Sequence, residues 1–128
     1  METMETINPS LITQVANIGN GGRITPFRWR GLSINVRYSL DLREALAFID
    51  NVMSACTDAD TGDFHVEMLD LITRASVVTM FTNIELPADL ETQFKILYWT
   101  DLYGEIKARI NESQLESLTN TIERYINT

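Results

Sequence analysis

Cysteine and histidine are nearly absent from this sequence of 128 residues, which has one of each, Cys56 and His65. A single cysteine excludes an internal disulfide framework and a zinc site built from several thiolates. Cys56 follows an apolar helical stripe, so we expect a small buried hydrophobic residue there rather than a reactive thiol. The scarcity of thiols indicates a reducing compartment.

Long apolar runs are also missing, so the sequence predicts no transmembrane helix. The first 22 residues lack a basic segment followed by a long apolar one, and we therefore expect no secretory signal. Hydrophobic residues still make up 45% of the chain. That content, at this length, predicts one domain with its own core.

Positive charge is scarce, with 10 Lys and Arg against 18 Asp and Glu, a net charge of −8. Residues 1–38 hold two acids and four arginines, whereas residues 39–128 hold sixteen acids and six bases. The acidic part would repel phosphates, so we expect no direct binding to nucleic acid. Opposite charges at the two ends also suggest that copies of the chain could join head to tail.

Catalytic motifs are missing too. The sequence has no G-x-S-x-G stretch, and "GNGG" at residues 19–22 lacks the lysine and the serine or threonine of a phosphate-binding loop. A single histidine would have to serve every proton-transfer role. We expect no enzyme activity and no cofactor.

The segment "CTDADTGDFHVE", residues 56–67, concentrates carboxylates beside Cys56 and His65. Counted from Asp58 as an EF-hand loop, position 5 is a glycine, position 6 is Asp63 where glycine belongs, and position 12 is Leu69, which cannot bind calcium. We expect a solvated turn, with Asp63 as the cap of the next helix and no metal. A non-standard calcium loop, a site using His65, and thus a metal-dependent enzyme or calcium sensor remain alternatives.

Periodicity divides the chain into an arm, a hairpin and helices. Residues 1–22 predict a flexible arm, with Asn8 as a helix cap before Pro9 and "GNGG" as a hinge. This arm would either pack on its own domain or reach a neighbour. Residues 24–38 alternate apolar and polar side chains around Gly31, which predicts a β-hairpin.

Helical spacing begins at residue 40. Asp41 with Glu44, and Asn111 with Gln114, predict capping boxes at two helix starts. The expected helices cover residues 42–55, 66–81, 88–99 with a kinked continuation near 100–101, and 112–126. The first of them should bury Leu42, Ala45, Leu46, Ile49, Val52, Met53 and Cys56. The predicted fold is α+β, mainly α, with the arm and hairpin followed by a bundle of four to five helices, residues 23–128 forming one domain.

Tryptophan and arginine, which often anchor protein interfaces, gather in "FRWRG", while "YWTDLYGE" holds three aromatic residues. Trp29 would be either such an anchor or a core residue. Of the face shared by Tyr98 and Leu102 and the face shared by Trp99 and Tyr103, one should be core. The candidate partner-binding residues are Arg28, Trp29, Arg30, Arg37, Trp99 and Tyr103.

Four stretches within residues 27–119 give the chain a resemblance to a known class: "FRWRGLSINVRYSLDLREALAFIDNV", "VVTMFTNIELP", "LYWTDLYGEI" and "INESQLESL". In the order of its features the chain resembles small acidic proteins from the tail and head–tail modules of tailed bacteriophages and prophages, particularly tail assembly chaperones. The N-terminal arm departs from that pattern. The resemblance implies binding to other phage proteins or to copies of itself, a possible homo-oligomer, in the cytoplasm of the bacterial host or in the virion.

The expected function is therefore that of a structural or assembly protein that binds other proteins. The alternative is an acidic inhibitor whose carboxylates imitate phosphates and occupy the nucleic-acid-binding site of a host protein.

Overall fold

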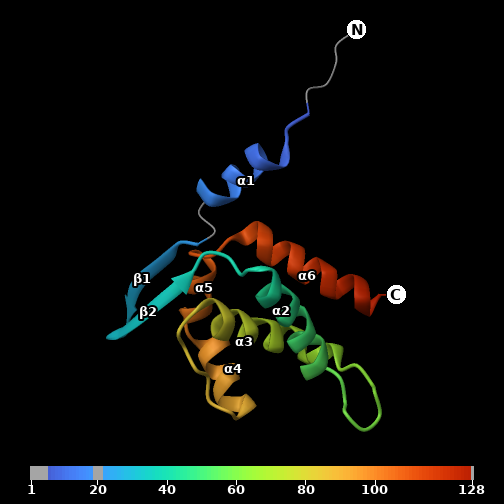
Figure 1. The fold of residues 1–128 in the computed structure, drawn as a ribbon. Coiled ribbons are helices and arrows are strands. Elements are labelled where there is room, and N and C mark those ends of the chain that lie inside the picture. Colours follow the sequence, from blue (N-terminus) through green and yellow to red (C-terminus); the bar gives the residue numbers. More distant parts are fainter. Residues whose placement is uncertain (1–5, 19–21, 128) are drawn as a thin grey trace.

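The computed structural model describes residues 6–18 and 22–127 and confirms the predicted α+β, mainly α class (Figure 1). Residues 1–5 and 19–21, which include most of the predicted hinge, lie outside the described residues. The elements, in chain order, are α1 (Pro9–Ile18), β1 (Ile24–Trp29), β2 (Leu32–Arg37), α2 (Leu42–Ala55), the 3-10 helix η1 (Val66–Met68), α3 (Leu69–Phe81), α4 (Leu90–Trp99), α5 (Leu102–Lys107) and α6 (Glu112–Ile126).

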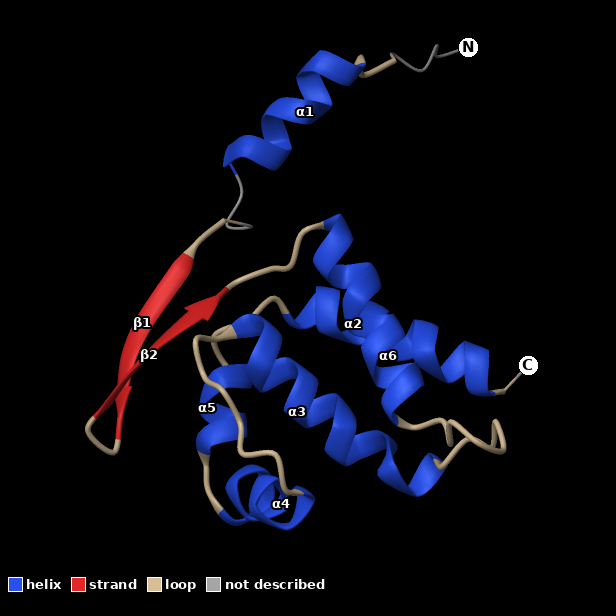
Figure 2. Ribbon diagram, turned by 60° about the horizontal axis from the view of Figure 1, so that its bottom comes forward, coloured by secondary structure: helices blue, strands red, loops and turns tan. Residues whose placement is uncertain are grey.

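Helix α1 starts where the sequence predicts. Pro9 takes the first helical position, where its missing N–H costs nothing, and the side chain of Asn8 accepts a hydrogen bond of 2.9 Å from the N–H of Leu11. In both views α1 lies beyond the hairpin, apart from the other helices (Figures 1 and 2).

Strands β1 and β2 pair antiparallel, with Ile24 opposite Arg37 and Trp29 opposite Leu32. The two residues between them, Arg30 and Gly31, have φ values of 49° and 81°, the geometry of a type I′ turn. Such a turn matches the twist of the flanking strands, and glycine takes positive φ without strain. The predicted hairpin is therefore confirmed.

The free edge of β2 is covered by the segment that follows α3. The side chain of Asn83 accepts a hydrogen bond of 2.9 Å from the N–H of Asn35 and donates one of 3.4 Å to the carbonyl of Ser33. Val36 also forms an isolated bridge with Thr82. This segment therefore fixes the hairpin against the end of α3.

Helix α2 has the predicted capping box between Asp41 and Glu44. Its buried face agrees with the predicted stripe only in part: Ala45, Ile49, Val52, Met53 and Cys56 are buried or pack against the core as predicted. Leu42 and Leu46 are 76% and 58% exposed, whereas Phe48, which the prediction omitted, is fully buried with Val52. The prediction that Leu42 and Leu46 face the core was wrong because the chain offers two apolar faces on this helix, and packing against α3 selects the one with Phe48.

The loop before α3 does not use Asp63 as a helix cap, and that prediction was wrong. The carbonyl of Asp63 instead accepts a hydrogen bond of 2.8 Å from the N–H of Asp58. Thr57 bridges Phe64 and closes the loop, so η1 and then α3 begin without a side-chain cap.

The predicted break near residues 100–101 separates α4 from α5. Thr100 has extended backbone at the end of α4, and the N–H of Leu102 donates to its hydroxyl at 3.3 Å. Helix α6 then starts at its predicted cap, Asn111. Its predicted partner Gln114 instead reaches the segment before α2, where its amide accepts from the N–H and donates to the carbonyl of Leu40, both at 2.8 Å.

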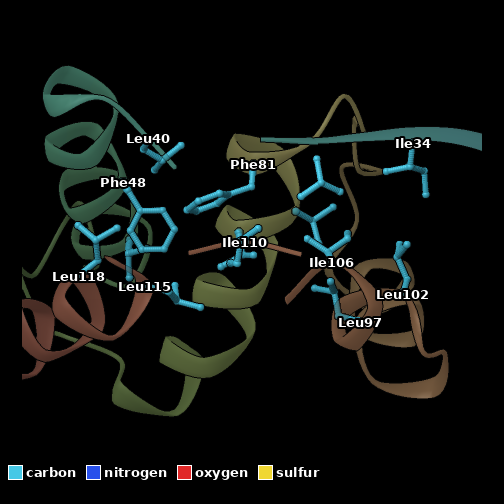
Figure 3. Packing of buried hydrophobic residues seen from close by; sticks show 14 of the residues in the cluster. Ile34, Leu40, Phe48, Phe81, Leu97, Leu102, Ile106, Ile110, Leu115 and Leu118 are labelled. Carbon is cyan, nitrogen blue, oxygen red and sulfur yellow. The ribbon is translucent and has the colours of Figure 1, made fainter. Parts of the chain in front are cut away.

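The core lies among α2, α3, α4, α5, α6 and the inner face of the hairpin (Figure 3). Phe48 from α2 and Phe81 from the end of α3 meet at its centre. The buried cluster comprises Ile34, Val36, Leu40, Phe48, Val52, Val77, Val78, Phe81, Leu97, Leu102, Ile106, Ile110, Leu115, Leu118 and Ile122.

Candidate functional site

The tip of the hairpin presents the first candidate residues. Arg28 donates from its guanidinium to the hydroxyl of Ser33 at 3.0 Å and to the carbonyl of Gly31 at 2.7 Å, so it braces its own turn. Arg30 is exposed and lies over the ring of Trp29, 4.8 Å from the centroid. Both cations reach solvent at the tip, which leaves them accessible to an acidic partner.

Trp29 has a structural role in addition to any partner contact. Its indole N–H donates a hydrogen bond of 2.8 Å to the carboxylate of Asp101, at the start of α5, and its ring packs partly buried against the core cluster. Trp29 therefore fastens the hairpin to the junction between α4 and α5. Its exposed neighbour Arg30 is the better candidate for contact with a partner.

Arg37 is neutralised within the chain. Its guanidinium forms a two-pronged ion pair with Glu44 of α2, with one hydrogen bond of 2.6 Å and a second, shorter one. These bonds raise the pKa of Arg37 and lower the pKa of Glu44 to about 2. Because Glu44 also closes the capping box of α2, Arg37 joins the hairpin to that helix rather than offering a free cation.

Trp99 ends α4 and is 70% exposed, with the ammonium of Lys95 lying 5.2 Å from its ring centroid. Phe94, also exposed, stacks on Tyr98 with centroids 4.6 Å apart. This side of α4 is thus an aromatic surface with a cation at its edge. The side chain of Trp99 is therefore open to a partner.

Tyr103 belongs to a different arrangement because the helix restarts after Thr100. It is half buried, and the guanidinium of Arg74 lies 4.8 Å from its ring and 4.3 Å from the ring of Tyr98. Asp70 holds Arg74 through a bond of 3.0 Å to Nε and accepts a hydrogen bond from the hydroxyl of Tyr98. The structure therefore brings Tyr103 together with Tyr98 around one arginine.

This tyrosine–arginine cluster was missed by the sequence analysis, although the spacing of Asp70 and Arg74 on one helix face was a usable signal. Burial, followed by the hydrogen bond to Asp70, raises the pKa of Tyr98 to about 12, and burial raises the pKa of Tyr103. Both tyrosines stay protonated at neutral pH, so neither can act as a base. The adjoining hollow, about 360 Å³ in volume, is lined by Asp70, Thr73, Tyr103, Lys107, Glu112, Leu115, Glu116 and Thr119.

The acidic loop of residues 56–67 forms a self-contained turn. The carboxylate of Asp58 accepts hydrogen bonds from the N–H groups of Asp60 at 2.8 Å and Thr61 at 3.1 Å, which lower its pKa. His65 lies 3.1 Å from a carboxylate oxygen of Glu67. Within residues 6–18 and 22–127, no group of three or more His, Cys, Asp or Glu side chains is arranged to hold a metal ion.

Cys56, at the start of this loop, is buried, and burial raises the pKa of its thiol. The thiol is therefore protonated and shielded at neutral pH, as expected for a small hydrophobic residue of the core.

Two exposed apolar surfaces complete the candidate site. The first, called here the α1 face, consists of Ile7, Leu11, Ile12 and Val15, each between 53% and 66% exposed. The second, the α2–α6 groove, has a volume of about 470 Å³ and is lined by Leu46, Ile49, Asp50, Met53, Thr121 and Tyr125. Leu46 of α2 lines the groove because it faces outward rather than into the core.

None of the helices in the described part of the chain has the length and the apolar content needed to cross a membrane. No protein-family model matches the sequence, and comparisons with curated proteins and with solved structures return no similar protein.

Proposed function

We propose that this chain acts by binding other proteins, as a structural or assembly protein of a tailed phage, and that it carries out no catalysis. The observation that supports binding most directly is the α1 face. A helix of ten residues is marginal in water by itself, since most helical stability in proteins comes from packing an apolar face. The side chains of the α1 face are each more than half exposed, and none of them belongs to the core cluster or to the apolar side chains packed against it.

The composition of α1 supports the same proposal. The helix contains no charged residue, and its apolar side chains fall at helical spacing along one side. Exposed apolar patches of this kind mark interaction sites more often than they mark ordinary surface. A partner surface that covers the α1 face would remove those side chains from water and stabilise the helix.

A second contact region supports the proposal from another part of the fold. Trp99 on α4 is an exposed aromatic ring beside the cation of Lys95, and Arg30 at the hairpin tip is an exposed cation over the partly buried ring of Trp29. Interface hot spots are enriched in tryptophan and arginine. The phage class itself rests on the resemblance in residues 27–119, which suggests other tail or head–tail proteins as partners.

Light scattering tests this function on the purified full chain, alone and mixed with proteins encoded beside it. We expect a complex larger than a monomer, and we expect Leu11→Asp with Val15→Asp to weaken it because both place a charge on the α1 face. Thr13→Asp, which adds a charge on the opposite side of α1, is the matched control.

A chain that stays monomeric and binds none of these proteins would overturn the proposal. Salt-sensitive binding to a basic nucleic-acid-binding protein, with no binding to assembly proteins, would replace it with the inhibitor function.

A further inference from the structure

The α1 face and the α2–α6 groove are two apolar surfaces on the same chain. With a rise of 1.5 Å per residue, the ten residues of α1 extend about 15 Å. The stretch of α2 from Leu46 to Met53 that lines the groove covers about 10 Å by the same rise. The apolar side chains of α1 span less than the whole helix: Leu11 and Val15 lie about 6 Å apart along its axis, within the length of the groove.

The spacing of side chains also suits this contact. Leu11 and Val15 stand four residues apart, so they lie on one ridge of α1, with Ile12 beside them. An amphipathic helix that lays such a ridge into an apolar groove is a recurring form of protein recognition. The groove offers Leu46 and Met53 along its length, with Leu46 58% exposed.

Charge favours contact between the N-terminal part of one copy and the helical part of another. Residues 39–128 carry sixteen acids and six bases, so the helical parts of two copies repel each other. Helix α1 brings no charge to that surface, and the strands after it carry arginines. Among the described residues that line the groove, one is charged, Asp50. The N-terminal part is therefore the part of a second copy that can approach the groove without repulsion.

We propose that α1 of one copy docks in the α2–α6 groove of a second copy. The proposal deepens the proposed function, on which it rests, by naming the partner as the same chain. Both views place α1 away from the α2–α6 body of its own chain (Figures 1 and 2). A single helix in a groove buries less than a standard interface of about 1,600 Å², and exchange of α1 in both directions doubles the buried area.

Disulfide trapping tests the contact directly. Val15→Cys is made in one chain and Leu46→Cys in another that carries a larger tag, and the two are mixed under mild oxidation. A disulfide forms only when the two Cα atoms come within about 7 Å. We expect a covalent dimer that contains one chain of each kind. Thr13→Cys, on the opposite side of α1, should lose most of that product when it replaces Val15→Cys.

The wild-type chain is the control for background oxidation, because its one thiol, Cys56, is buried. The double variant, with Val15→Cys and Leu46→Cys in one chain, distinguishes docking within a chain. If the double variant gives a cross-linked monomer and the mixture gives no covalent dimer, α1 docks on its own chain and the proposal is overturned.

Solution mass provides an independent readout. We expect the wild-type chain to sediment above the monomer mass at micromolar concentration and Leu46→Asp to shift it to monomer. Asn51→Asp adds the same charge to α2 outside the groove and should leave the mass unchanged. A wild-type monomer across this range, with no trapped dimer, overturns the self-docking proposal. If that monomer still binds a neighbouring assembly protein, the proposed function stands without it.

Discussion

The indole N–H of Trp29 in β1 donates a hydrogen bond of 2.8 Å to the carboxylate of Asp101, 72 residues further along the chain. The bond joins the hairpin to the junction of α4 and α5, two regions that carry candidate partner-binding residues. Asp101 precedes α5 without capping it through its side chain. The carboxylate is therefore available to the indole.

A double-mutant cycle measures what this bond contributes. Trp29→Phe and Asp101→Ala each remove one partner, and the double variant removes both. We expect a coupling free energy of about 1 kcal/mol, typical of a hydrogen bond within reach of water. Urea unfolding followed by circular dichroism gives the three values. If the free-energy changes of the single variants add up to that of the double variant, the bond does not stabilise the fold.

The ion pair between Arg37 and Glu44 predicts a dependence of stability on pH. The pKa of Glu44 in the folded chain is about 2, below its ordinary value of 4.5, chiefly because the carboxylate accepts hydrogen bonds from Arg37. In the unfolded chain the carboxylate of Glu44 takes up a proton more readily than in the folded chain. The ion pair therefore stabilises the fold above pH 4.5 and loses that effect as the pH falls toward 2.

Glu44→Gln should therefore unfold at a lower urea concentration than wild type at pH 7. The expected loss in the free energy of unfolding is at most about 1 kcal/mol, because the pair is partly exposed. The difference should shrink as the pH falls below 4.5. Asp60→Asn, in the exposed loop, is the control for removal of a carboxylate. A difference between Glu44→Gln and wild type that is the same at pH 7 and pH 3 would contradict the assignment.

The side chain of Gln114 satisfies both backbone groups of Leu40, a residue that is almost fully buried. Gln114→Ala leaves an N–H and a carbonyl without these partners, and we expect a loss of about 2 kcal/mol in the free energy of unfolding. Gln114→Glu should lose less, because a carboxylate can still accept from the N–H. Ser113→Ala, exposed on the same turn, should change little. Equal stability of Gln114→Ala and Ser113→Ala would exclude this role.

Two glycines should respond in opposite directions to alanine. Gly31 has a φ of 81° in the hairpin turn, so Gly31→Ala should destabilise the fold by about 1 kcal/mol. Gly104 lies in α5 with nothing within 4 Å of an added Cβ, so Gly104→Ala should stabilise by up to about 1 kcal/mol. Thermal unfolding of both variants checks the signs. A melting temperature that rises for Gly31→Ala would contradict the turn geometry.

Interactions between residues close in sequence were predictable. The hairpin, the caps at Asp41 and Asn111 and the break after Trp99 follow from side-chain spacing over a few residues. Features that depend on distant partners were not. Phe48 faces the core because α3 lies there, and Gln114 turns from its own helix cap to Leu40 because the chain before α2 passes beside it.

The candidate site divides in the same way. The sequence shows candidate interface residues in "FRWRG" and "YWTDLYGE", and of these Arg30 and Trp99 are exposed whereas Trp29 is partly buried. The ion pair of Arg37, the anchoring of Trp29 and the pairing of Tyr103 with Tyr98 depend on residues from other elements. The α2–α6 groove was not predictable because it depends on how α2 packs against α3 and α6, which leaves Leu46 exposed.

The hairpin has a further consequence for how copies of this chain can meet. Asn35 donates its backbone N–H to Asn83, on the side away from β1. Pro26 pairs with Asn35, so the backbone nitrogen of Pro26 lies on the outer edge of β1. Proline has no N–H to offer there, and the outer edge of β2 is already occupied. Neither border can easily accept another strand, which protects the protein from growth into a continuous cross-β fibre. Ordered contacts between molecules must then come from side-chain surfaces, such as the α1 face and the hairpin tip, rather than from strand pairing.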